Sequence, residues 1–164
     1  MRETFGSTWT MQLMFSFTLL FVCFLAVTIS YSKAFRIRNE VISIIEKNGG
    51  YTTGARQIID DYIKNTGYTA SGNCSYEPTK KTYGIKDLNG TTSSRVLISS
   101  GNSNQKFLYC ISRDYANSIQ VSDVIYEVTM FYKFNLPIVG EITSFTIEGK
   151  TTDLTQKNDL FDGI

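Results

Sequence analysis

The chain has 164 residues, of which 42% are hydrophobic and 19% charged, and its formal net charge is +1. The near-neutral charge argues against a nucleic-acid partner, which would need a basic face to neutralise phosphates. The chain contains no histidine, so Ser-His and Cys-His nucleophile pairs and His-ligated metals are excluded. We therefore expect a protein that is not an enzyme and has no cofactor, metal site or catalytic residue.

An apolar run from about Trp9 to Ile29 is the first predicted element, interrupted only by Gln12 and small residues, most of them hydroxyl-bearing. Because about 20 helical residues cross the hydrocarbon core of a bilayer, the run predicts a single transmembrane helix. A cleaved signal peptide is the competing interpretation. It is disfavoured because the run exceeds the usual apolar core of a signal peptide and no helix-breaking residue follows it.

The helix is expected to continue past the membrane, because residues 7–48 contain neither Gly nor Pro. Hydrophobic residues recur there at helical spacing. They are Tyr31, Ala34, Phe35, Ile37, Val41, Ile42, Ile44 and Ile45. Gly49 and Gly50 then predict the end of the helix. The chain is accordingly divided into an N-terminal segment with the transmembrane helix, residues 1–31, and a globular domain, residues 32–164.

A second helix is predicted from about Gly54 to Asn65, with Thr52 or Thr53 as its cap. Its hydrophobic stripe is expected to pack on a core. The stripe consists of Ile58, Ile59, Tyr62 and Ile63. Asp60 and Asp61 lie on the same helix without a third acidic ligand in view, so we interpret them as a solvated face and not a metal site.

A long surface loop is predicted from Gly67 to Ser94, which is rich in Gly, Ser, Thr and Asn and carries the basic pair Lys80-Lys81 as solvated residues. Cys74 lies in this loop and Cys110 beyond it. Two cysteines without metal-like spacing favour a disulfide formed outside the cytosol. Two unrelated buried thiols are the alternative. Cys23, inside the apolar run, is interpreted as a small apolar filler.

The rest of the chain predicts four antiparallel strands, at about residues 96–99, 106–112, 124–134 and 141–149, with a hairpin loop at residues 101–104 between the first two. Residues 124–134 alternate, and every even-numbered residue among them is apolar. A sheet with one apolar face needs a cover. The sequence therefore predicts an α+β fold in which the amphipathic half of the long first helix packs on a sheet of about four strands.

This layout resembles the type IV pilin-like proteins, and most closely the TadE/TadG-like minor pilins of the tight-adherence pilus system. The resemblance is carried by "ISYSKAFRIRNEVISIIEKNGG" after the apolar run and by "VIYEVTMFYKFNLPIVGEITSFTIEGKTTDL" near the C-terminus. It covers about half of the chain. It implies a minor pilin or assembly subunit of a bacterial surface filament, whose partners are other pilin-like subunits, the pilus assembly machinery and membrane lipid.

The pilin pattern also implies a leader that ends in Gly and a Glu at the fifth mature position. Gly6 followed by Ser7 matches a leader cleavage site, but the fifth position is then Met11, and Glu3 lies before the cut. The departure puts leader cleavage and ordinary polymerisation in doubt, and favours a tip-like subunit or an unprocessed platform component over a repeating subunit. Gln12, the one strongly polar residue of the span, is predicted to make a subunit contact.

Orientation rests on two opposed signals. The basic residues Lys33, Arg36 and Arg38 follow the span and favour a cytoplasmic domain by the positive-inside rule. The cysteine pair favours the opposite side. We expect a single-pass protein of the cell membrane or a surface filament, with an extracytoplasmic domain.

Two other functions compete with filament assembly. One is a monomeric membrane-anchored binding module that uses the loops around residues 68–92. The other is an anchored hydrolase. It is disfavoured because Cys110 and Arg113 lack a histidine partner and no Ser lies in a G-x-S-x-G context.

Overall fold

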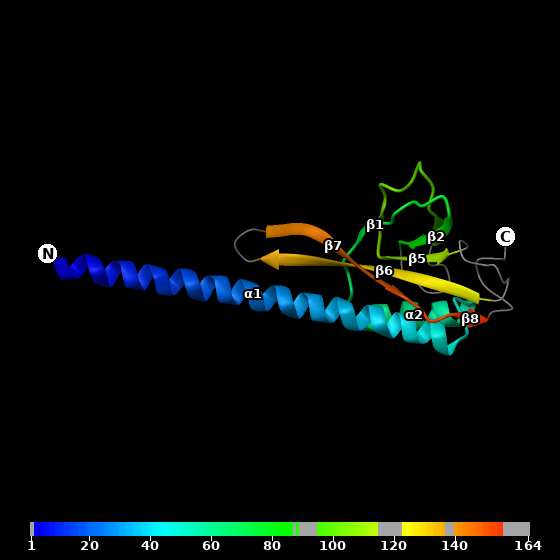
Figure 1. Ribbon diagram of the computed structural model, residues 1–164, viewed down its shortest axis with the longest axis horizontal. Coiled ribbons are helices and arrows are strands. Elements are labelled where there is room, and N and C mark those ends of the chain that lie inside the picture. The colour runs from blue at the N-terminus through cyan, green and yellow to red at the C-terminus, as the bar shows by residue number, and fades with distance from the viewer. Residues whose placement is uncertain (1, 87, 89–94, 115–122, 137–139, 156–164) are drawn as a thin grey trace.

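The computed structural model describes residues 2–86, 88, 95–114, 123–136 and 140–155, and a long helix packed on an antiparallel sheet dominates it (Figure 1). The predicted α+β class is confirmed. The elements in chain order are α1 (Arg2–Lys47), α2 (Thr53–Asn65), β1 (Gly72–Asn73), β2 (Lys80–Ile85), β3 (Arg95–Leu97), β4 (Lys106–Phe107), β5 (Tyr109–Asp114), β6 (Asp123–Leu136), β7 (Gly140–Lys150) and β8 (Leu154–Thr155).

Helix α1 is uninterrupted and ends where the two glycines predict. Gly49 adopts φ +66°, a conformation that a residue with a Cβ rarely takes. The amide of Gly50 donates to the carbonyl of Ile45 at 2.8 Å, and that of Gly49 to the carbonyl of Glu46 at 3.1 Å. This pair of bonds is a Schellman motif, which satisfies carbonyls that the helix end would otherwise leave unpaired.

The C-terminal half of α1 is the cover of the sheet, as predicted. Its apolar stripe is buried against β6 and β7. The buried residues are Ala34, Ile37, Val41, Ile44 and Ile45. Tyr31 and Phe35, which the periodicity also assigned to the stripe, remain 47% and 38% exposed. They lie at the edge of the packed region, where the helix leaves the domain.

Helix α2 begins as predicted, because the Thr52 hydroxyl accepts a hydrogen bond from the Ala55 amide at 3.2 Å. Two assignments on this helix were wrong. Ile58 is 49% exposed and does not belong to the packed stripe, whereas Ala55 does. Asp60 is only 6% exposed, so Asp60 and Asp61 are not a common solvated face. Helical rotation by 100° per residue turns Asp60 toward the core beside Ile59 and leaves Asp61 outside.

The strand order of the main sheet is β3-β2-β5-β6-β7, and every neighbouring pair is antiparallel. This order corrects the expected succession. β3 pairs with β2 and not with the strand that follows the 101–104 loop, and β5 crosses back to the other side of β2. β8 resumes the pairing with β6 at Asp123 and Val124, with the register shifted by one residue from that of β7.

β2 lies inside the segment that the sequence assigned to a surface loop. Its last four residues, 82–85, are all buried, so the strand shows no alternation of exposed and buried residues. Gly84 contributed to the wrong assignment, but it is needed: a Cβ there would lie 2.4 Å from Cδ1 of the Phe107 ring. Lys80 is not a solvated loop residue either, because it is the first residue of this strand.

Two cores lie on opposite faces of the sheet. The larger one joins both helices to the even-numbered residues of β6, namely Val124, Tyr126, Val128 and Met130, which confirms the predicted alternation. The second lies on the other face and consists of Cys74, Ile98, Phe107, Cys110 and Phe131. Phe131, expected on the open face, is therefore fully buried.

The structure joins Cys74 to Cys110, with a Cα–Cα distance of 5.9 Å. Cys23 is not part of a disulfide. The bridge fastens the residues before β2 to β5, and both cysteines are 2% exposed in the second core.

Polar contacts also join α1 to β7 and to the residues that follow β7. Nη1 of Arg38 donates to the carbonyl of Glu148 at 2.6 Å, and Oε1 of Glu46 accepts from the amide and the hydroxyl of Thr152. Gly149 has no side chain where α1 passes. A Cβ there would lie 2.7 Å from Cδ1 of Ile42. The helix and β7 can therefore approach closely.

Candidate functional site: the exposed half of α1 and its junction with the domain

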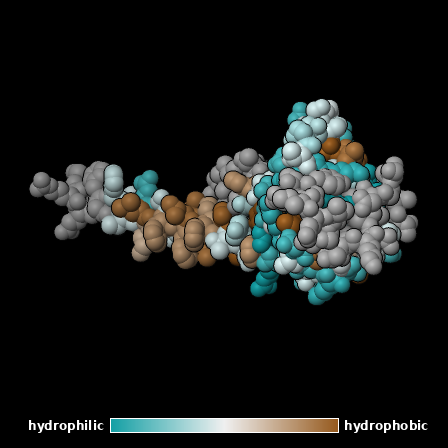
Figure 2. Space-filling view, turned by 45° about the vertical axis from the view of Figure 1, so that its right-hand side comes forward, coloured by the Kyte–Doolittle hydropathy of each residue, from teal (hydrophilic) through white to brown (hydrophobic). Residues whose placement is uncertain are grey.

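The N-terminal half of α1 extends beyond the domain as an apolar rod (Figures 1 and 2). Its side chains are described from residue 8, and large hydrophobic ones are exposed all around the helix. Trp9, Met14 and Phe17 are 70%, 72% and 72% exposed, and Ile29 is 69% exposed. By length and composition α1 contains one stretch able to cross a membrane. Nothing in the described part of the domain covers this surface before Cys23.

Two threonine hydroxyls in this stretch suit an apolar environment, since each is satisfied within the helix. The Thr18 hydroxyl donates to the carbonyl of Met14 at 2.8 Å, and the Thr28 hydroxyl to that of Phe24 at 2.9 Å. Such bonds hide polar groups from hydrocarbon. They leave Gln12 as the residue whose polar group reaches furthest from the backbone.

Gln12 is exposed on the helix surface beside Trp9, Leu13 and Ser16. Its assigned role as a subunit contact stays a prediction. Gly6 and Ser7 lie in the first turns of α1, and their exposure is outside the described part. Leader cleavage between them also stays a prediction.

One side of the apolar stretch is partly covered before the domain proper begins. The residues concerned are Cys23, Ala26, Val27 and Ser30, which are half-buried and lie on one face of the helix. β6 and β7 run alongside α1 toward its N-terminus at this level (Figure 1). The other side of the helix remains apolar and exposed as far as Ile29. The domain therefore overlaps the end of the apolar stretch on its sheet side only.

Four aromatic rings form a row where the helix enters the domain. The Tyr31 ring stacks with that of Phe35 at 6.2 Å between centroids, and meets that of Tyr132 edge-on at 5.9 Å. Tyr132 in turn stacks on Phe145 at 5.3 Å. The guanidinium of Arg38 lies 4.4 Å from the centroid of Phe35. We call the four aromatic residues Tyr31, Phe35, Tyr132 and Phe145 the aromatic row. Burial and the neighbouring Tyr31 raise the pKa of Tyr132.

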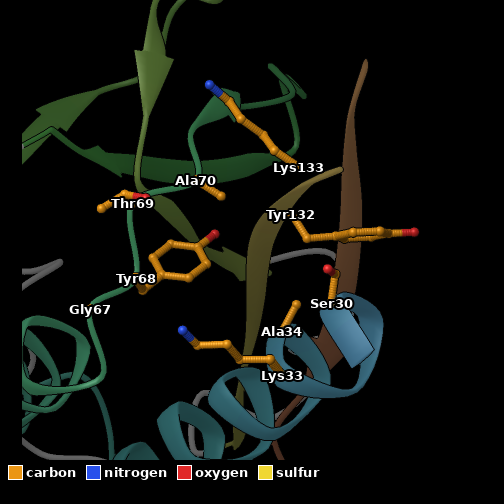
Figure 3. A pocket seen from close by; sticks show the side chains of 9 residues that line it. All are labelled: Ser30, Lys33, Ala34, Gly67, Tyr68, Thr69, Ala70, Tyr132 and Lys133. Carbon is orange, nitrogen blue, oxygen red and sulfur yellow. The ribbon is translucent and has the colours of Figure 1, made fainter. Parts of the chain in front are cut away.

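A polar cleft of about 290 Å³ lies beside the row, between α1, β6 and the segment that follows α2 (Figure 3). It is lined by Ser30, Lys33, Ala34, Gly67, Tyr68, Thr69, Ala70, Tyr132 and Lys133. Among these lining residues two are lysines and none is Asp or Glu. Figure 3 shows the amine of Lys33 below the Tyr68 ring and Lys133 extending at the opposite end.

The Tyr68 hydroxyl is already used by the backbone. It donates to the carbonyl of Phe131 and accepts from the amide of Phe131, at 2.7 Å for the second bond. Desolvation by burial raises the pKa of Tyr68. Tyr68 therefore forms a fixed wall of the cleft, and the groups that can meet a ligand include the Lys33 amine and the hydroxyls of Ser30 and Thr69.

Two further polar clusters lie in the domain, and both have a structural role. The Tyr109 hydroxyl donates to Oδ1 of the buried Asp60 at 2.8 Å, and Arg56 lies 3.8 Å from the same carboxylate. Nζ of Lys80 lies 2.9 Å from carboxylate oxygens of both Glu77 and Glu127. Its hydrogen bonds to Glu127 and Glu77 raise the pKa of Lys80.

Sequence reasoning missed the aromatic row and the cleft. Each joins residues about 100 positions apart, and no short motif marks either. The only local signal was a pair of exposed aromatics, Tyr31 and Phe35, continuing the apolar pattern past the span. Within the described ranges no group of three or more His, Cys, Asp or Glu is placed to hold a metal ion.

Comparison with protein-family models, with curated proteins and with solved structures finds no match to this chain. Functional inference therefore rests on the residues themselves.

Proposed function

We propose that the chain is a membrane-anchored minor pilin or pilus-assembly subunit, which acts by packing its exposed helix against the helices of other pilin-like subunits. One observation carries the proposal: a single unbroken helix is apolar and uncovered in its N-terminal half and forms the core of the domain in its C-terminal half. An anchor of this kind holds the domain at a fixed distance and direction from the apolar stretch. A simple tether would not require that rigidity.

The disulfide supports one side of the membrane for the domain. Because such bridges persist in oxidising compartments, Cys74–Cys110 supports an extracytoplasmic domain. Of the three basic residues that favour the opposite orientation, Arg38 is held by Glu148 and Phe35, so its position has a structural reason. Long translocated domains also override the charge rule.

The test is to shear surface appendages from cells and measure the intact mass of the protein in the sheared and membrane fractions. A processed subunit is expected in the sheared fraction, shorter by residues 1–6 and lighter by two protons for the disulfide. An unprocessed subunit would be sheared at full length. Protein confined to the membrane fraction would contradict incorporation into a filament.

Gln12→Leu tests the subunit contact within the same assay. A buried side-chain amide between membrane helices contributes about 1–2 kcal/mol, so we expect its loss to lower the sheared fraction several-fold. Met11→Leu is the matched control. It introduces the same residue at the neighbouring position, which is 62% exposed, but replaces an apolar side chain and removes no amide. Equal incorporation of both variants would remove Gln12 from the proposal.

A monomeric membrane-anchored binding module is the second function, and the cleft is the observation that favours it. The residues expected to bind a ligand contribute only in part. Tyr68, Thr69 and Ala70 line the cleft, whereas Tyr83 is buried and does not. A protein that stays monomeric in membranes, with Gln12→Leu without effect, would support this function over filament assembly.

A further inference from the structure

The cleft beside the aromatic row lies at the level where a bilayer changes from hydrocarbon to headgroups. Exposed apolar side chains of α1 continue to Ile29, and Lys33 follows four residues later, about 6 Å along the helix axis. The headgroup region on each side of the hydrocarbon core is of similar thickness. Ser30 and Lys33 would therefore lie among the headgroups.

The aromatic row gives a second, independent marker of the same level. Tyr and Trp rings concentrate at membrane–water interfaces because they combine an apolar body with a polar tip. Tyr31 and Phe145 are 47% and 42% exposed, and come from elements far apart in the sequence. Tyr132 belongs to the row and also lines the cleft. The row and the cleft therefore share one level.

The lining of the cleft selects a ligand by charge. Two lysines contribute positive charge and the hydroxyls of Ser30 and Thr69 can donate hydrogen bonds, while the residues that line the cleft include no carboxylate. Lysine binds phosphate as a compact point charge. A volume of about 290 Å³ is enough for a headgroup, and the apolar surface of α1 below it suits acyl chains.

We propose that this cleft binds the phosphate of an anionic phospholipid headgroup in the leaflet adjoining the domain, with Lys33 as the principal contact and Lys133 as a second positive charge at the opposite end. The site uses α1, β6 and the segment after α2, so a bound lipid would bridge helix and sheet at the membrane surface. The proposal depends on the membrane span and not on filament assembly, so the sheared-fraction experiment and the lipid experiment can fail separately.

The test is native mass spectrometry of the full-length protein in detergent micelles with equal amounts of phosphatidylglycerol and phosphatidylcholine. We expect the wild-type protein to retain phosphatidylglycerol preferentially. Lys33→Gln removes a charge-assisted contact and should lower that retention by on the order of tenfold, whereas Lys33→Arg should keep most of it. Lys133→Gln should have a smaller effect.

Lys47→Gln is the matched control, because it removes the same charge from the same helix about 21 Å from Lys33. Intact mass and circular dichroism check that each variant keeps its disulfide and fold. Equal retention by Lys33→Gln and Lys47→Gln would overturn the proposal. So would displacement of the lipid by glycerol phosphate at equal concentration, since the site would then serve a soluble phosphate.

Discussion

The hydroxyl of Tyr68 binds the backbone of β6 at the point where the pairing of β6 with β5 ends. β5 pairs with β6 only as far as Met130, and the next residue, Phe131, finds its backbone partner in Tyr68. A buried backbone group without a partner costs about 1–3 kcal/mol. One side chain from the segment after α2 thus completes the sheet and also forms the wall of the cleft.

Tyr68→Phe should therefore lower the free energy of unfolding by about 1–3 kcal/mol, because both backbone groups of Phe131 lose their partner. Thermal denaturation of the full-length protein in detergent measures the change. Tyr76→Phe is the control, since Tyr76 is 45% exposed and its change should stay within about 0.5 kcal/mol. A Tyr68→Phe variant as stable as the control would show that water replaces the hydroxyl.

Alkaline pH should destabilise the protein through buried tyrosines. Burial raises the pKa of Tyr51 to about 12, and that of Tyr68 and Tyr109 also lies above the usual value near 10. Above pH 10 the unfolded chain therefore releases these protons and the folded protein does not, so stability falls as pH rises. Lys80 acts in the same direction, because its raised pKa means that its stabilisation is complete below about pH 10.5 and is lost above it.

Denaturation between pH 8 and pH 11.5 checks this prediction. Each group that stays protonated only in the folded state contributes up to about 1.4 kcal/mol per pH unit. Tyr51→Phe removes one such group and should flatten the slope above pH 10. A free energy of unfolding that is constant from pH 8 to pH 11.5 would contradict the assignment.

At the scale of elements, two strands depend on the absence of a side chain. Gly84 in β2 lies under the Phe107 ring, and Gly72 in β1 lies under that of Phe131, where a Cβ would come within 2.3 Å of Cδ1. Both rings belong to the second core, so the glycines allow the small strands β1 and β4 to lie close to the main sheet.

Gly84→Ala should accordingly destabilise the protein by about 1–3 kcal/mol, because the Phe107 ring must move. Gly54→Ala is the matched comparison with the opposite sign. Its Cβ would lie 4.0 Å from the nearest side-chain atom, in the first turn of α2, and should stabilise by about 0.5 kcal/mol. Chemical denaturation of both variants measures the difference. Equal effects would show that the second core rearranges without cost.

At the scale of the whole molecule, the disulfide joins the residues before β2 to the centre of the sheet across 36 positions. In the chain-entropy model, closing a loop of that size contributes about 3–4 kcal/mol. Both cysteines also belong to the second core, which is the smaller of the two. Removal of the bridge therefore also removes packing from this core.

The double variant Cys74→Ser and Cys110→Ser should therefore unfold with a free energy about 3–4 kcal/mol lower than that of the wild type. Cys23→Ala, which removes the cysteine outside the bridge, should leave the domain's stability nearly unchanged. Denaturation under oxidising conditions compares the three proteins. A double variant as stable as Cys23→Ala would show that packing alone holds the second core.

The sequence by itself determined the long helix, its end just before Gly49, the capped second helix, the alternation of β6 and the α+β class. Each depends on interactions between residues close in the chain: unbroken helical propensity, a left-handed glycine, a Thr cap and a period of two or of 3.6. The exposed apolar half of α1 could also be predicted, because length and hydropathy alone identify a candidate membrane span.

Only the tertiary structure decided the position of β2, the burial of Asp60, the ion pairs of Lys80, the aromatic row and the cleft. The last four residues of β2 are buried on both faces, and Gly84 among them leaves room for the Phe107 ring of β4. The strand therefore lacks the alternation of polar and apolar residues by which a strand is predicted from sequence. Asp60 and Lys80 are polar residues whose partners, Tyr109 and Glu127, lie 49 and 47 positions away. Lys33 and Lys133 meet one cleft only because β6 folds back along α1, and that long-range contact is what the fold adds to the sequence.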